Sequence, residues 1–170
     1  MARIEISGVG IEYELLGAEG AHCVSITPGG RMSMAAGGVR ELGEALALLG
    51  KRVLLWDRPN CGLSDWHFEG DNESAMQGRF LTQLIRALDL GPTALAGGSA
   101  GSRCTLLAAA QDPEVVSHLV QWWISGGTVS LMSLGASYDA DPAIAASMGG
   151  MAAVAGMVSC VVLRLCTIIA

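Results

Sequence analysis

Residues 97–101 of this 170-residue chain, Gly-Gly-Ser-Ala-Gly, have the residue types and the spacing of a site that could carry out covalent chemistry. A serine stands here between glycines two positions before and after it, where a short apolar run meets a helix-forming stretch. A sharp strand-to-helix turn of this kind exposes the serine hydroxyl and places the next N–H at a helix start, where it can bind an oxyanion. The pattern predicts Ser99 as a nucleophile, Ala100 as an oxyanion donor, and Gly97 and Gly101 as the glycines that leave room for the turn.

Two other interpretations of these residues stay open. The same letters occur in ordinary tight turns of α/β folds, where the serine has no chemical role. A glycine-rich nucleotide loop is disfavoured, since neither G-x-x-x-x-G-K-[ST] nor G-x-G-x-x-G follows a predicted strand. The next predicted strand also ends without an acidic residue that could bind a ribose.

Two further stretches fit acyl-transfer chemistry. In Thr27-Pro28-Gly29-Gly30, Gly29 or Gly30 could bring a second backbone N–H to an oxyanion, because glycine permits close backbone approach. Residues 56–65 form a second turn that contains Asp57 and Arg58, for which we expect a structural role in holding the loop.

The elements that must position these residues alternate along the chain. Alternating or continuous apolar runs predict strands over 2–6, 10–16, 22–27, 52–57, 93–97 and 116–125. Helical spacing predicts helices over 39–49 (apolar at Val39, Leu42, Leu46 and Leu49), from Asp71 or Asn72 to Leu88, and from Ser99 to Asp112. The order indicates an α/β fold: a mostly parallel sheet with an N-terminal antiparallel hairpin and helices on both faces.

Over about residues 3–130 the chain resembles the α/β-hydrolase superfamily, in its serine-nucleophile branch. The resemblance rests on "TPGG", "DRPNCGLSD" and "GGSAG", which are similar to the family's oxyanion loop, its post-strand turn and its nucleophile elbow. Thr27-Pro28 replaces the usual His-Gly, and Asn60 stands where glycine is common. The resemblance implies hydrolysis of a small-molecule ester, thioester or ketone-adjacent carbon–carbon bond, with no cofactor and no metal.

The partners that would activate Ser99 are missing from the expected positions. A serine hydroxyl needs a histidine to take its proton and a carboxylate to orient that histidine, and in this family both follow the serine. The chain's three histidines are His22, His67 and His118. Acidic residues after the serine are Asp112, Glu114, Asp139 and Asp141. None fits, so we expect an incomplete hydrolase fold, the N-terminal portion of a hydrolase, inactive in this form.

The composition of the chain excludes some classes of binding partner. With 10 basic and 16 acidic residues and no basic cluster, the chain offers no footprint for nucleic acid. Its five cysteines show no C-x-x-C spacing, which favours reduced thiols over disulfides or a zinc site. No secretory signal opens the sequence, and a cytoplasmic location is expected.

We predict that residues 1–130 form the hydrolase core part and that 131–170 form the start of a cap region and an apolar tail, which could be a non-native ending. Residues 147–170 are long enough for a membrane span, but Arg164 and many small residues disfavour one. The alternative function is a non-catalytic α/β binding or interaction module. An incomplete sheet would leave an unpaired edge through which such a chain could self-associate.

Overall fold

The structure is a computed structural model that describes residues 1–126, 132–133, 135–136, 140–150 and 152–154. The chain divides into two compact units, Met1–Ser125 and Gly126–Ala170. The six strands and three α-helices that surround Ser99 all belong to the first unit.

The first unit is built on a six-stranded sheet in the order β1-β2-β4-β3-β5-β6. The hairpin pairs β1 with β2, and β2 pairs antiparallel with β4, whereas β4, β3, β5 and β6 run parallel. The strands are β1 (Ala2–Ile6), β2 (Val9–Leu16), β3 (Cys23–Thr27), β4 (Arg52–Trp56), β5 (Thr93–Gly98) and β6 (Val116–Trp122). The predicted fold class is confirmed, and β6 ends three residues earlier than the pattern suggested.

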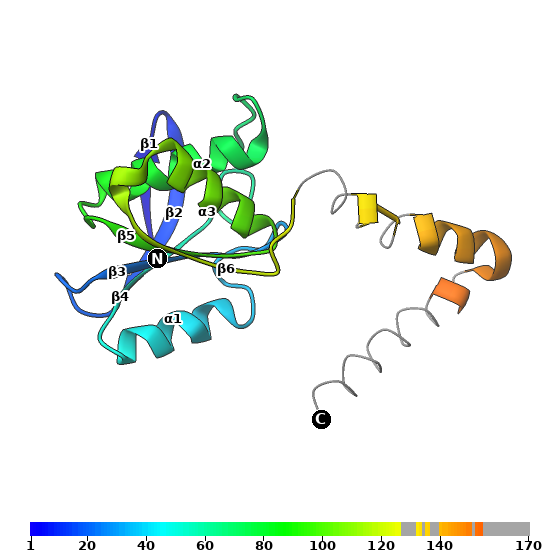
Figure 1. Cartoon of the computed structure of the whole chain (residues 1–170), viewed down its shortest axis with the longest axis horizontal. Helices are drawn as coiled ribbons and strands as arrows, with labels where there is room; N and C mark the ends of the chain where they lie inside the picture. Colours follow the sequence, from blue (N-terminus) through cyan, green and yellow to red (C-terminus); the bar gives the residue numbers. More distant parts are fainter. Residues whose placement is uncertain (127–131, 134, 137–139, 151, 155–170) are drawn as a thin grey trace. The chain divides into compact units, whose positions relative to one another are not determined.

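Helices cover both faces of this sheet (Figure 1). One face carries α1 (Val39–Leu48), and the other carries α2 (Glu73–Ala87) and α3 (Ala100–Gln111), followed by the short 3-10 turn η1 (Pro113–Val115). Asn72 begins α2, because its side chain accepts a hydrogen bond from the Ala75 N–H at 2.8 Å.

The two faces have separate apolar cores. The larger lies under α2 and α3 and contains the helix stripe expected from the sequence: Met76, Phe80, Leu81, Leu84 and Ile85. Cys104 is fully buried there, and burial raises the pKa of its thiol to about 12. A thiol with that pKa is an unreactive packing group.

The smaller core, under α1, corrects part of the sequence interpretation. Leu42 and Leu49 were expected to face the sheet but are 40% and 76% exposed. Gly43 is the buried residue of this helix, and a Cβ there would lie 3.2 Å from Leu16 and Leu55. Val39 and Leu46 pack against this core, as the spacing predicted, whereas Leu42 and Leu49 do not. The helix approaches the sheet most closely through its glycine.

The second unit contains a helix over residues 141–150, with its side chains exposed or half-buried. In the part of the chain that the structure describes, no helix has the length and apolar character needed to cross a membrane. Most of residues 147–170 lies outside the described residues. The assignment of 131–170 to a cap and tail therefore stays a prediction.

Candidate functional site

Ser99 lies where β5 ends and α3 begins. Its backbone has φ 52° and ψ −119°, a conformation that favours glycine. The Ser99 N–H donates to the Trp122 carbonyl at 3.2 Å, and the Ser102 hydroxyl donates to the Ser99 carbonyl at 2.5 Å. These bonds hold a strained turn, and such strain persists only where surrounding structure determines it.

Three glycines make this turn sterically feasible. A Cβ on Gly101 would lie 2.1 Å from the Thr27 carbonyl oxygen, and one on Gly97 would lie 2.4 Å from Thr105 Oγ1. Gly98 is as crowded, since a Cβ there would lie 2.4 Å from the Trp122 ring. The motif spacing predicted a role in the turn for Gly97 and Gly101 but none for Gly98, although the letters "GGSAG" contain it.

The predicted oxyanion loop adjoins the serine. Thr27 of β3 pairs with Gly97 of β5, so the chain leaves both strands at the same edge of the sheet. A Cβ built on Gly29 would lie 2.9 Å from Ser99 Cβ and 3.5 Å from its Oγ. Gly30 follows with φ 48° and open space around it. The structure thus brings Gly29, Gly30, Ser99 and Ala100 together.

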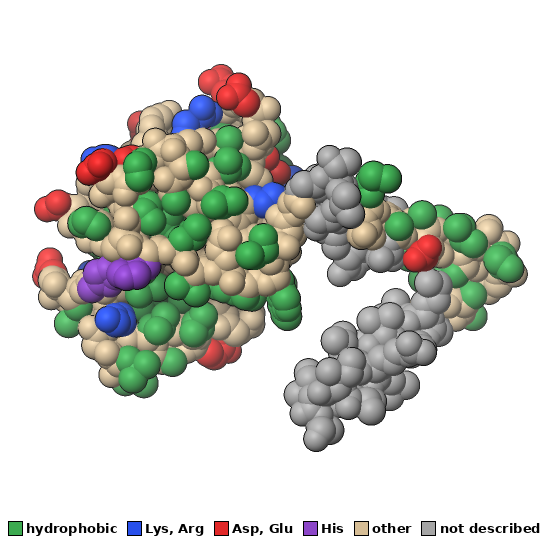
Figure 2. All heavy atoms as spheres, viewed as in Figure 1, with side chains coloured by type: hydrophobic (Ala, Val, Ile, Leu, Met, Phe, Trp, Pro, Cys, Tyr) green, Lys and Arg blue, Asp and Glu red, His purple; other side chains and the backbone are tan. Residues whose placement is uncertain are grey.

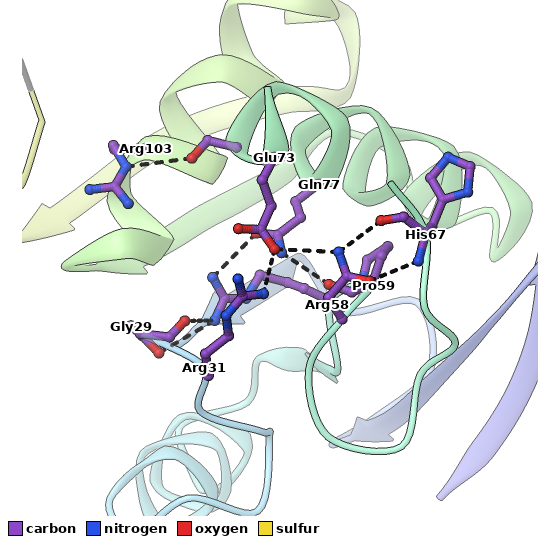
Figure 3. A network of polar contacts seen from close by, with 11 residues as sticks. Gly29, Arg31, Arg58, Pro59, His67, Glu73, Gln77 and Arg103 are labelled. Carbon is purple, nitrogen blue, oxygen red and sulfur yellow. Dashed lines mark hydrogen bonds and ion pairs between the residues drawn. The ribbon is translucent and has the colours of Figure 1, made fainter. Parts of the chain in front are cut away.

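Arg58 lies in the protein interior and donates hydrogen bonds to this loop (Figure 3). The side chain is 2% exposed, and its Nη2 donates to the carbonyls of Gly29 and Gly30 at 3.3 and 2.8 Å. Its Nη1 donates to Gln77 Oε1 at 3.3 Å. In a trans peptide the C=O and the following N–H point in opposite directions. Because the Gly29 carbonyl faces Arg58, the Gly30 N–H faces away from it.

Asp57 joins the same loop to the turn after β4. It is 2% exposed, and its two carboxylate oxygens accept hydrogen bonds from the Met34 and Leu63 N–H groups at 2.7 and 2.8 Å. Its carbonyl accepts from the Ser64 hydroxyl at 2.6 Å. These contacts confirm the structural role expected for Asp57.

The histidines lie elsewhere. His118 pairs with Ala94 at the start of β5, whereas Ser99 follows the other end of that strand, as the sequence predicted. His22 sits beside His118, with ring centroids 6.0 Å apart, and its Nε2 lies 2.9 Å from Ser117 Oγ. The His67 ring packs edge-on against Phe80 and points away from the Arg58 network in Figure 3.

The acidic residues that follow Ser99 within the first unit, Asp112 and Glu114, lie away from it. Asp112 ends α3 at the end remote from Ser99, and both its oxygens accept from Arg86 at 2.7 and 2.9 Å. This ion pair lowers the pKa of the Asp112 carboxyl. Glu114 is exposed in η1, Asp141 belongs to the second unit, and Asp139 lies outside the described residues.

The backbone strain at Ser99 gives a stability prediction. We expect Ser99→Gly to raise the free energy of unfolding by about 1 kcal/mol. The substitution relieves backbone strain of about 1–3 kcal/mol, but glycine makes the unfolded chain more flexible, which lowers stability by about 0.4–1 kcal/mol. Ser99→Ala removes the same hydroxyl but keeps the Cβ, so it should bring no such gain. Urea unfolding of the two variants measures the difference, and equal stabilities would contradict the strain.

Comparisons with known proteins agree with this geometry. The profile of the alpha/beta hydrolase fold family matches residues 28–121. The chain is 31% identical to "Serine hydrolase BPHL" of Homo sapiens over 132 residues, which cover 71% of this chain and 42% of that protein. The counterpart from Mus musculus is 29% identical over the same share of each chain. The chain thus spans less than half the length of these curated relatives.

Solved structures share the fold. An epoxide hydrolase, VrEH1 from Vigna radiata, matches with a TM-score of 0.68 at 17% identity, over 81% of this chain and 46% of that one. Cfl2 from Burkholderia cenocepacia matches with a TM-score of 0.64 at 23% identity, over 70% of this chain and 39% of that one. At these identities the likeness concerns the fold, and the family follows from the profile match. The chain belongs to the alpha/beta hydrolase fold family.

Proposed function

We propose that this chain carries the nucleophile half of a serine hydrolase that acts on a small-molecule ester or related carbonyl substrate. Ser99 Oγ would attack the carbonyl carbon. The Ala100 N–H and the N–H of Gly29 or Gly30 would stabilise the oxyanion. The observation that carries the proposal is the strained Ser99 turn against the Gly29 loop, with Ser99 Oγ 3.5 Å from the position of a Gly29 Cβ.

Attack by the hydroxyl requires a base to take its proton. In a complete triad a histidine does so and later protonates the leaving group. His22, His67 and His118 have other neighbours in this chain, so we propose that Ser99 acts slowly in these 170 residues. Loss of a triad member typically lowers the rate by several orders of magnitude.

External imidazole should substitute in part for the missing base. We expect release of p-nitrophenol from p-nitrophenyl acetate to be slow, and its rate to rise with imidazole more steeply for the chain than for Ser99→Ala. The Ser99→Ala protein subtracts the reaction of imidazole with the ester in solution. Equal rates for the two proteins at all imidazole concentrations would contradict the proposal. Fast turnover without imidazole would instead show that the chain already contains the base.

The edge strand supports a second candidate function, association with a second copy of this chain. Among the described residues, β6 pairs only with β5, and Leu119, Val120 and Trp123 are 38%, 56% and 82% exposed. Hydrophobic side chains reach the visible surface of the first unit around this strand (Figure 2). An edge strand with one unpaired side and exposed apolar side chains is a template for strand pairing.

Light scattering after size-exclusion chromatography tests this association. We expect the chain to form dimers or larger species, and Val120→Lys to shift it toward the monomer, because an edge lysine opposes strand pairing. Leu106→Lys, on the exposed surface of α3, is the matched control and should leave the distribution unchanged. A monomeric parent chain would exclude this second function.

A further inference from the structure

We propose that a hollow beside Ser99 binds a carboxylate group of the substrate. The hollow has a volume of about 260 Å³ and is lined by Gly30, Ala100, Glu73 and three arginines, Arg31, Arg58 and Arg103. It therefore shares Gly30 and Ala100 with the proposed oxyanion hole. The inference deepens the proposed function by assigning it an anionic substrate class.

The charges around the hollow do not balance. Glu73 is the one acidic residue among those lining residues, and it pairs with Arg31 at 2.5 Å. Arg103 donates to two hydroxyls, Ser74 Oγ at 3.4 Å and Ser125 Oγ at 3.0 Å. Arg58 donates to carbonyl and amide oxygens. Two guanidinium charges thus remain without a carboxylate in the described part of a chain whose net charge is −6.

Arg58 supplies the observation that points to a ligand. It is 2% exposed, and its Nε has no hydrogen-bond partner in the described part of the chain. A buried charge is costly unless it is paired and fully hydrogen-bonded. A carboxylate bound in the hollow would balance the charge of this guanidinium.

The start of α3 adds to the attraction. This 12-residue helix begins at Ala100, so its free N–H groups and positive dipole end lie at the hollow. Arg103 follows one turn later and projects from α3 toward the start of α2, as Figure 3 shows. The start of the helix and the guanidinium groups would therefore attract the same anion.

The position of the hollow limits the substrate. A molecule whose carboxylate lies among these arginines and whose carbonyl lies at Ser99 must carry the two groups a few atoms apart, because Ala100 contributes to both sites. Half-esters of short dicarboxylic acids and short keto acids have this form. The three arginines that line the hollow would disfavour a cationic substrate.

Nuclear magnetic resonance titration tests the site without requiring turnover. The uniformly ¹⁵N-labelled chain is titrated with monomethyl succinate and, separately, with the neutral dimethyl succinate. We expect the half-ester to shift the Gly30, Ala100 and Arg103 amide signals and the diester to bind about tenfold more weakly or not at all. Equal affinity for the two esters would overturn the proposal.

Variants separate the site from the overall fold. Arg103→Gln should weaken binding of the half-ester about tenfold, because one charge-assisted contact is lost. Arg79→Gln makes the same change at an exposed position of α2 and should leave binding unchanged. An amide spectrum that keeps its dispersion shows that each variant is folded. Equal effects of the two substitutions would indicate general charge attraction and overturn the proposal.

Ser99→Ala distinguishes this inference from the proposed function on which it rests. The variant should still bind monomethyl succinate, since the arginines are intact. Binding without any Ser99 reactivity would keep the anion site and reject the nucleophile. Ser99 reactivity without preference for the anion would keep the nucleophile and reject the site.

Discussion

Replacing Gly101 with alanine is expected to lower the free energy of unfolding by about 3 kcal/mol, the upper part of the range for overpacking. The added Cβ would lie 2.1 Å from the Thr27 carbonyl oxygen and 2.6 Å from that of Pro28. Both atoms belong to the backbone of β3 and the loop after it, which cannot rotate away as a flexible side chain could. The start of α3 must therefore move away from the oxyanion loop.

Urea unfolding followed by circular dichroism measures this loss. Gly37→Ala is the matched control, because a Cβ there meets nothing within 4 Å and Gly37 does not have a positive φ. We expect this control to change stability by less than about 1 kcal/mol. If Gly101→Ala were as stable as Gly37→Ala, the close approach of α3 to β3 would be wrong, and with it the contact between the turn and the oxyanion loop.

Replacing Asp57 with alanine is expected to cost a similar amount, about 3 kcal/mol. The substitution leaves the Met34 and Leu63 N–H groups without their acceptor. Each buried donor that loses its partner costs about 1–3 kcal/mol. Because Asp57 joins two loops, its loss should also loosen the Gly29 loop.

Two measurements separate the loss of global stability from the loosening of the loops. Urea unfolding gives the change in free energy, and hydrogen exchange should show faster exchange at Met34 and Leu63 in Asp57→Ala. Asp71→Ala is the control, since Asp71 is exposed at the surface. Unchanged exchange at Met34 and Leu63 would contradict the bridging role of the carboxylate.

Much of the fold could be predicted from the sequence because its signals are local. The buried run of β4 and the apolar stripe of α2 follow from periodicity, and Asn72 is a recognisable helix start. The face of α1 could be predicted only in part from spacing, which placed Val39 and Leu46 correctly but not Leu42 and Leu49. The spacing of leucines predicts which residues are hydrophobic enough to be buried. It does not show that the buried Gly43 lets the helix approach Leu16 and Leu55, because those residues belong to strands distant in the sequence.

The site could be predicted only in part, for a similar reason. The letters around Ser99 define a turn, and the order of motifs suggested Gly29 and Gly30. Their closeness depends on β3 lying beside β5 in the sheet, which joins segments about 70 residues apart. Arg58 was expected to hold a loop, but its two carbonyl contacts and its unpartnered Nε arise from tertiary packing and have no signature in the sequence.

The most direct test of the account is the position at which a fluorophosphonate modifies the chain. The reagent forms a bond from phosphorus to the nucleophilic oxygen and releases fluoride, so peptide mass spectrometry identifies the reacting residue. We predict one modification per chain, at Ser99, formed slowly in buffer and faster with imidazole, and absent in Ser99→Ala. Modification elsewhere, or none at Ser99 with imidazole present, would contradict the assignment of Ser99 as the nucleophile.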